Sequence, residues 1–272
     1  MRNSGGYKRL LLSFFSAYLI PPRCPACDAT VPIFGKAEPF CETCRAEWDA
    51  QTAESCPVCG LSPELCVCLP DALREKGIRD AIFLSFYRAG QRSVSDRMLY
   101  RIKSERDMRV FRFLAGALTE RIIAFCTENG IDPQDAALTA LPRRRRAVRE
   151  HGFDQAVTLA KAIAKTSGIP YLALLKRARG GKEQKRLSGE ERIENLRNAF
   201  SLAVKGACLT GKTVFLVDDI MTTGSGLSAC AALLLDAGAD RVIPVTVART
   251  VKKQRKTPRT KEENYEGNEG TG

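Results

Sequence analysis

Short apolar runs and amphipathic stretches alternate along most of this chain. Four runs rich in β-branched or aromatic residues predict strands at 78–87, 136–141, 214–217 and 241–248. Four stretches with apolar residues at helical spacing predict helices at 94–106, 110–129, 155–166 and 227–237. Asp154 is placed to cap the third of these helices. Strands that alternate with helices predict an α/β fold built on a parallel sheet.

Two carboxylates and a hydroxyl-rich turn follow the predicted strand 214–217. Asp218 and Asp219 come at its carboxyl end. The turn that leads into the next helix consists of Thr222, Thr223, Gly224 and Ser225. Ligands of open parallel sheets bind at the carboxyl ends of the strands, where a helix N-terminus offers unpaired N–H groups. The turn can wrap a phosphate, and the carboxylates can hold a ribose diol and Mg²⁺. The alternative is a structural strand–turn–helix corner with an acidic turn.

This segment resembles the phosphoribosyl pyrophosphate (PRPP) signature of type I phosphoribosyltransferases. In that signature a hydrophobic strand, two acidic residues and a Thr/Gly/Ser-rich turn follow one another. The resemblance implies that Asp218 and Asp219 are the catalytic pair that contacts the ribose hydroxyls, and that the turn 222–225 cradles the 5′-phosphate. It also implies that Mg²⁺ accompanies PRPP. Many members carry a hydroxyl at the position of Gly226, so Ser225 is the last hydroxyl of this turn.

A basic loop is predicted between the strand 136–141 and the helix 155–166, on the same edge of the sheet as the acidic pair. Its arginines, beginning with Arg143 and Arg144, can hold a pyrophosphate through charge-assisted hydrogen bonds. The alternative is a solvated basic loop. The loop also holds the only histidine, His151, for which a structural role is the simpler interpretation. The polar stretch 184–200 predicts either a lid over the site or an inert surface excursion.

Eight of the eleven cysteines fall between positions 24 and 68. They form the pairs Cys24/Cys27, Cys41/Cys44, Cys56/Cys59 and Cys66/Cys68. A C-x-x-C turn directs two thiolates at one ion, and two such turns complete a tetrahedral site, so we predict one or two structural Zn²⁺ ions. Sequential pairing, with the first four cysteines around one ion and the last four around another, is the simplest arrangement; interleaved pairing stays open. Disulfides would need an oxidising compartment, which nothing else in the sequence indicates.

Positive charge is unevenly distributed. The formal net charge is +12 at pH 7, yet residues 24–70 hold seven acidic residues against two basic ones. The excess gathers in 143–149, 176–197 and the tail from 252, which predicts phosphate-bearing partners, either small molecules or nucleic acid. Because the cysteine region is acidic, a protein contact or a purely structural role is favoured there over nucleic-acid binding.

These patterns divide the chain into four parts. We expect an apolar N-terminal helix at 1–23, a double zinc ribbon at 24–70, a phosphoribosyltransferase-like domain at 76–250 and a disordered charged tail at 251–272. No apolar run reaches the ~18–20 residues that span a bilayer. The apolar run 10–20 leads into Pro21-Pro22 rather than a small-residue cleavage site. We therefore expect a cytoplasmic protein, with contact to the inner membrane surface as a minor alternative.

In order along the chain, these features resemble the ComF family, and the resemblance covers nearly everything except the tail. ComF-like sequences commonly read Arg-Gly-Phe-Asn-Gln where this one reads His151-Gly-Phe-Asp154-Gln155. The resemblance implies a PRPP-binding protein involved in natural transformation. Its implied partners are single-stranded DNA and proteins of the DNA-uptake machinery, the latter reached through the zinc ribbon. Two alternatives stay open: an active phosphoribosyltransferase of base salvage, and a zinc-dependent DNA-binding regulator.

Overall fold

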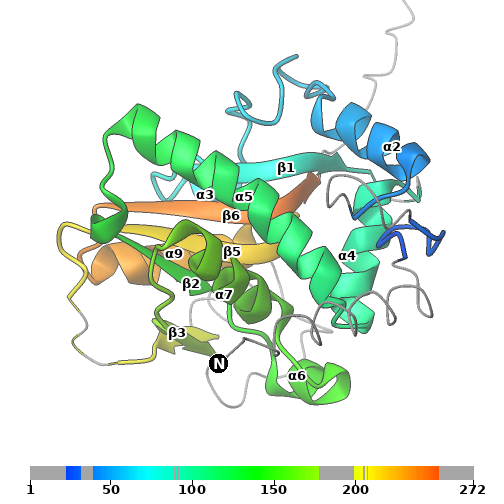
Figure 1. The fold of residues 1–272 in the computed structure, drawn as a ribbon. Helices are drawn as coiled ribbons and strands as arrows, with labels where there is room; N and C mark the ends of the chain where they lie inside the picture. The colour runs from blue at the N-terminus through cyan, green and yellow to red at the C-terminus, as the bar shows by residue number, and fades with distance from the viewer. Residues whose placement is uncertain are drawn as a thin grey trace, which may run out of the picture.

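The computed structural model describes residues 23–31, 39–88, 90, 92–177, 199–204, 206 and 208–250. Within this part of the chain, four strands form a sheet in the order β1, β6, β5, β2 (Figure 1). The strands are β1 (Ile82–Tyr87), β2 (Ala136–Ala140), β5 (Thr213–Met221) and β6 (Arg241–Thr250). All three pairings are parallel, which confirms the predicted α/β fold.

Helices cover both faces of the sheet (Figure 1). On one face lie α4 (Val94–Ser104), α5 (Met108–Asn129) and α7 (Gln155–Ser167), and on the other lies α9 (Ser225–Asp236). Successive side chains of β5 point to opposite faces of the sheet, so this strand packs against both helical layers. Phe215 and Val217 join the core with α5 and α7, whereas Val214 and Leu216 join the core with α9.

Local sequence signals fix the ends of these helices. The Asp154 carboxylate accepts a hydrogen bond from the Val157 N–H at 3.2 Å, which confirms the predicted cap of α7. Gly168 ends the same helix in the left-handed conformation, with φ 75°, which glycine adopts without a steric cost. At the start of α4, Ser93 and Asp96 form a reciprocal capping box.

The cysteine-rich region packs on both faces of the sheet. Its helix α2 (Glu42–Thr52) places Trp48 in the same core cluster as α4 and α5. Its second half leads into α3 (Asp71–Arg74), which contacts α9: the Ser228 hydroxyl donates to the carbonyl of Ala72 at 2.5 Å. Each half of the region is therefore attached to a different helical layer.

Several boundaries differ from the sequence predictions. β5 continues to Met221, so both carboxylates lie within the strand, because its ladder with β6 runs on to the pair Met221–Arg249. α9 begins at Ser225, two residues before the predicted start. The predicted strand 78–87 starts only at Ile82, because the N–H of Ile78 bonds back to Leu73.

Four further elements were not predicted as such. The stretch expected as a basic loop forms the short helix α6 (Arg145–His151), closed by Gly152 at φ 74°. An antiparallel pair, β3 (Leu175–Arg177) and β4 (Phe200–Leu202), flanks the polar stretch. A single turn of 3₁₀ helix, η1 (Pro133–Asp135), precedes β2.

The predicted N-terminal helix, apart from Arg23, lies outside the described residues, as do the charged tail 251–272 and nearly all of the predicted lid 184–200. Among the helices that the structure does describe, none is both long and apolar enough to cross a membrane.

Candidate ribose-phosphate site and cysteine clusters

The two carboxylates of β5 face opposite layers. Asp219 is 4% exposed and lies on the side of α4 and α7. Its Oδ2 forms an ion pair with the Arg143 guanidinium and lies 3.8 Å from Nζ of Lys103. The predicted acidic residue and the predicted pyrophosphate ligand Arg143 are thus in contact. One buried carboxylate holds two cations at the carboxyl edge of the sheet.

Asp218 lies on the side of α9. Its Oδ1 accepts a hydrogen bond from the Asp219 N–H at 2.8 Å. Burial, followed by the negative charge of Asp219, raises the pKa of Asp218 to about 8. The adjacent carboxylates therefore differ: Asp219 has cationic partners, and Asp218 is costly to ionise. Their oxygen atoms are the donor type that Mg²⁺ prefers, so the pair fits the predicted ion.

Lys103 is a site residue that the sequence did not reveal. It lies near the end of α4, where one lysine on an amphipathic helix gives no signal of function. Its backbone carbonyl accepts a hydrogen bond from Nε2 of the buried Gln155 at 3.0 Å. Gln155 belongs to the Gly-Phe-Asp-Gln segment that carried the family resemblance, and it ties the Lys103 backbone to α7.

The arginines of the basic stretch occupy different positions in the structure. The backbone N–H of Arg143 points to the Asp154 carboxylate at 3.4 Å, while its side chain reaches Asp219. Arg144 is exposed at the start of α6, and its charge acts on Arg177, whose pKa is lowered by burial and then by Arg144. His151 is exposed at the end of α6. In the described part of the chain, only Arg143 of the predicted pair contacts the carboxylates.

The predicted phosphate turn lies at the N-terminus of α9. Gly224 precedes the helix with φ 71°, and the hydroxyls of Thr223 and Ser225 lie 3.0 Å apart. Thr222 and Thr223 are exposed. This arrangement combines free helix N–H groups with hydroxyls, as an anion site requires. An added Cβ at Gly224 would lie 3.2 Å from both Leu73 Cγ and Pro70 Cβ, so the segment after the cysteines supports the turn.

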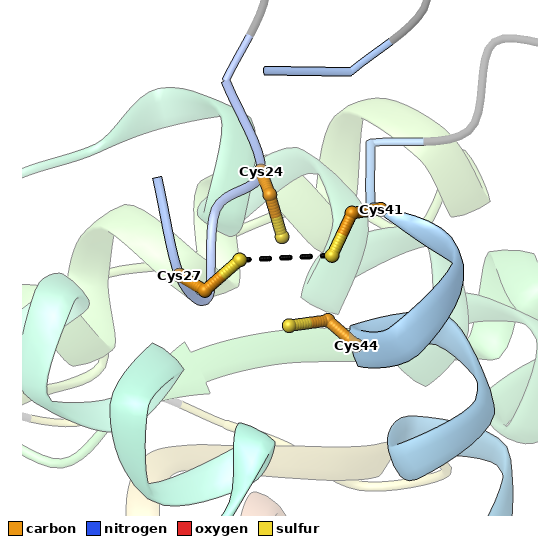
Figure 2. A group of neighbouring side chains, drawn as sticks. All are labelled: Cys24, Cys27, Cys41 and Cys44. Atoms are coloured by element: carbon orange, nitrogen blue, oxygen red, sulfur yellow. Dashed lines mark hydrogen bonds between the residues drawn. The ribbon is translucent and has the colours of Figure 1, made fainter. Parts of the chain in front are cut away.

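The eight paired cysteines form two clusters of four. Within each, the sulfur atoms lie within 4.8 Å of one another: Cys24, Cys27, Cys41 and Cys44 in the first, and Cys56, Cys59, Cys66 and Cys68 in the second. Figure 2 shows the four sulfurs of the first cluster pointing toward a common centre. The cysteines are therefore grouped in sequence order, as the simplest prediction had it, and not in the interleaved arrangement. This grouping includes the C-x-C pair Cys66/Cys68.

Both clusters fit Zn²⁺. Tetrahedral zinc with Zn–S bonds of about 2.3 Å places its sulfurs roughly 3.8 Å apart. Cys27 and Cys41 are 3.6 Å apart, and Cys59 and Cys66 are 3.7 Å apart. Burial works to raise the pKa of Cys24, but the backbone N–H groups of Cys41, Ala26 and Cys27 lower it to about 7. The same opposition, with the N–H groups of Cys59 and Val58, gives Cys56 a pKa of about 7. Each cluster thus has one thiol with a lowered pKa, whereas burial raises the pKa of the Cys44 and Cys66 thiols. A zinc ion would bind the deprotonated form of all four.

Comparison with known proteins agrees with a phosphoribosyltransferase-like sheet domain that follows a cysteine-rich region. The family model for the phosphoribosyl transferase domain matches residues 154–270. Competence protein F of Haemophilus influenzae is 38% identical over 92 residues, which cover 34% of this chain and 40% of that protein. Competence protein ComFC of Bacillus subtilis is 26% identical over 208 residues, 74% of this chain and 80% of that one. DNA utilization protein YhgH of Salmonella typhi is 28% identical over 155 residues, 57% and 66% of the two chains.

The parallel sheet, the family match and the cysteine clusters define a protein of the type I phosphoribosyltransferase fold with an N-terminal cysteine ribbon. The relatives and the two clusters fit a ComF family protein.

Proposed function

We propose that this chain binds PRPP, or a related ribose phosphate, together with Mg²⁺, and acts in DNA uptake on the cytoplasmic side. The observation that carries the ligand proposal is the juxtaposition at one sheet edge of the Gly224 turn, the acidic pair and the cations Arg143 and Lys103. The role in DNA uptake rests on relatives named for competence and DNA utilization. Phosphoribosyl transfer in base salvage is the enzymatic alternative.

The ion pair between Arg143 and Asp219 gives the site a binding mechanism. Without ligand, the two groups neutralise each other. A pyrophosphate that takes the Arg143 guanidinium leaves the Asp219 carboxylate to accept hydrogen bonds from the ribose hydroxyls. Lys103 stays close enough to add a second cation. Mg²⁺ bound with PRPP would offset the remaining pyrophosphate charge.

Calorimetric titration with PRPP and Mg²⁺ tests the site, with Gly224→Ala as the variant and Gly226→Ala as its control. The left-handed backbone at Gly224 costs a residue with a Cβ about 1–2 kcal/mol, so Gly224→Ala is expected to weaken binding about 5–30-fold. At Gly226 an added Cβ would make an ordinary contact, 3.4 Å from Leu141 Cδ2. Gly226→Ala should therefore bind nearly as the wild type does. A wild-type protein that gives no binding heat would contradict the proposal, and equal losses in both variants would contradict the role given to Gly224.

Single-stranded DNA is the second candidate ligand, because the arginines of α6 face solvent beside the site. Arg144, Arg145 and Arg149 are exposed. Binding through them should depend steeply on salt, with the slope of log K against log salt falling by about 0.7 for each phosphate contact. Changing all three to glutamine is expected to reduce that slope by about 2. The measurement is fluorescence anisotropy of a labelled oligonucleotide across a salt series.

A charge-matched control keeps this test specific. Arg79, Arg112 and Lys165 are also exposed and lie outside α6 in the sequence, and their triple glutamine variant removes the same charge. An equal effect of both triple variants would show that only net charge matters. Salt-independent binding, or none, would reject DNA as a ligand.

The second cysteine cluster offers a surface for a protein of the uptake machinery. Val58, Leu65 and Val67 are 51%, 65% and 68% exposed around it, and nearby Glu64 is also exposed. Apolar side chains on an acidic surface suit a protein contact better than a phosphate backbone. They therefore weigh against the alternative of a DNA-binding ribbon.

A further inference from the structure

Each cysteine cluster receives one guanidinium from the phosphoribosyltransferase fold. In the first, Nη2 of Arg97, on α4, donates to Sγ of Cys44 at 3.7 Å. In the second, Nη1 of Arg249, on β6, donates to Sγ of Cys66 at 3.1 Å. Arg249 and Cys66 are 183 positions apart, so only the fold brings them together.

Arg249 is a buried cation whose guanidinium contacts the sulfur of Cys66. Arg249 is 6% exposed, and its guanidinium lies 5.7 Å from the centre of the Phe83 ring. Among the described residues no ion pair with a carboxylate involves Arg249, and its Nε has no hydrogen-bond partner. A buried cation needs an anion close by, since an uncompensated one costs several kcal/mol. A cluster of thiolates around a metal ion supplies that charge.

A zinc-loaded cysteine cluster would carry the negative charge that a buried arginine requires. Zn²⁺ with four thiolates carries two excess negative charges, and outer-sphere donors stabilise such a site. Arg97 is in a similar position at the first cluster. Its side chain is 33% exposed, its Nη2 also contacts Glu47 at 2.8 Å, and its buried Nε has no partner among the described residues. Arg97 shares its charge with a carboxylate, whereas Arg249 does not.

We propose that Arg97 and Arg249 are positioning residues of two metal sites, each donating an N–H to a coordinating thiolate and offsetting the charge of the loaded cluster. The inference depends on zinc occupancy of the clusters and not on PRPP binding, so it can fail or stand independently of the proposed ligand. It also means that each ribbon half is completed by a residue from a different part of the sheet domain.

The test is zinc release from the full-length, zinc-loaded protein to a chromophoric chelator, with Arg249→Met and Arg97→Met as variants. Loss of an outer-sphere donor typically lowers metal affinity about 10–100-fold. We expect Arg249→Met to lower the affinity for one of the two zinc ions by this amount and to leave the affinity for the other unchanged. Arg97→Met should weaken the other equivalent, by about 10-fold, the lower end of that range, because its sulfur contact is longer. Arg249→Lys, which keeps the charge, should recover part of the loss.

The structure provides a matched control at each cluster. Arg101 pairs with Asp28 beside the first cluster, and Arg121 pairs with Glu64 at 3.1 Å beside the second; in the described structure neither contacts a sulfur. Arg101→Met and Arg121→Met therefore remove an arginine–ribbon contact without removing a sulfur donor, and they should release zinc as the wild type does.

Three outcomes overturn the proposal. The first is a release profile unchanged in both Arg249→Met and Arg97→Met. The second is an equal loss in the control variants, which would show a general packing effect. The third is a wild-type protein that holds no zinc when purified and loaded. If Arg249→Met yields no folded protein, the partly exposed Arg97 decides the matter, and unchanged release from Arg97→Met rejects both assignments.

Discussion

Replacing Asp219 with asparagine is expected to lower the free energy of unfolding by about 2 kcal/mol. The change removes the anion that Arg143 and Lys103 share. Loss of one partner of a buried ion pair costs about 3–5 kcal/mol. We expect less because the Arg143 and Lys103 side chains are 24% and 40% exposed and can regain water. In a domain of this size the change corresponds to a fall of about 4–8 °C in Tm, measured by thermal denaturation without PRPP or Mg²⁺.

Asp218→Asn is the matched control, and it should act in the opposite direction. The folded-state pKa of Asp218, about 8, is above its ordinary value, so the unfolded chain loses this proton first as pH rises. The wild type should therefore lose stability between about pH 4 and pH 8, and Asp218→Asn should remove that slope. Thermal denaturation at about pH 5 and pH 8 measures this difference. Both variants should bind PRPP more weakly, because each loses a proposed ribose contact.

The comparison within this pair decides the electrostatic assignment. If Asp219→Asn were as stable as the wild type, the ion pair would contribute nothing. If Asp218→Asn were less stable than the wild type at the higher pH, the raised pKa assigned to the Asp218 carboxyl would be wrong.

Removal of metal is expected to expose Trp48, the only tryptophan of the chain. Trp48 is 4% exposed and packs near Phe40 and Phe113, with ring centroids 6.1 and 5.2 Å away. Structural zinc contributes about 10–16 kcal/mol to the folding of small zinc domains. Without zinc, the packing of the first cysteine cluster around Trp48 should loosen. The tryptophan emission should then shift to the red on treatment with a strong chelator.

Variants of the two clusters separate their contributions. Cys44→Ser should reproduce the red shift without chelator, because it removes a ligand of the cluster beside Trp48. Cys56→Ser, in the second cluster, should leave the emission of Trp48 near that of the wild type. Unchanged emission from metal-free protein would show that the ribbon folds without zinc.

Local patterns were sufficient to predict the elements that form the candidate ribose-phosphate site. The periodicity of β5 and α9, the acidic pair and the turn 222–225 can be read from the sequence, because a strand, a cap and a glycine turn depend mainly on neighbouring residues. For the same reason the cap Asp154 was predicted correctly. Element boundaries were less accurate: the extent of β5 depends on its ladder with β6, which local propensity does not contain.

The sequence by itself thus determined the fold class, the position of the candidate ribose-phosphate site and the cysteines able to bind metal. Tertiary structure alone decided which cysteines share a cluster, and that Lys103 joins Arg143 at Asp219 while Arg144 does not. It also placed Arg249 against Cys66. These contacts join residues from different elements, and their partners are chosen by how the helices and the ribbon pack on the sheet, so no spacing along the chain encodes them.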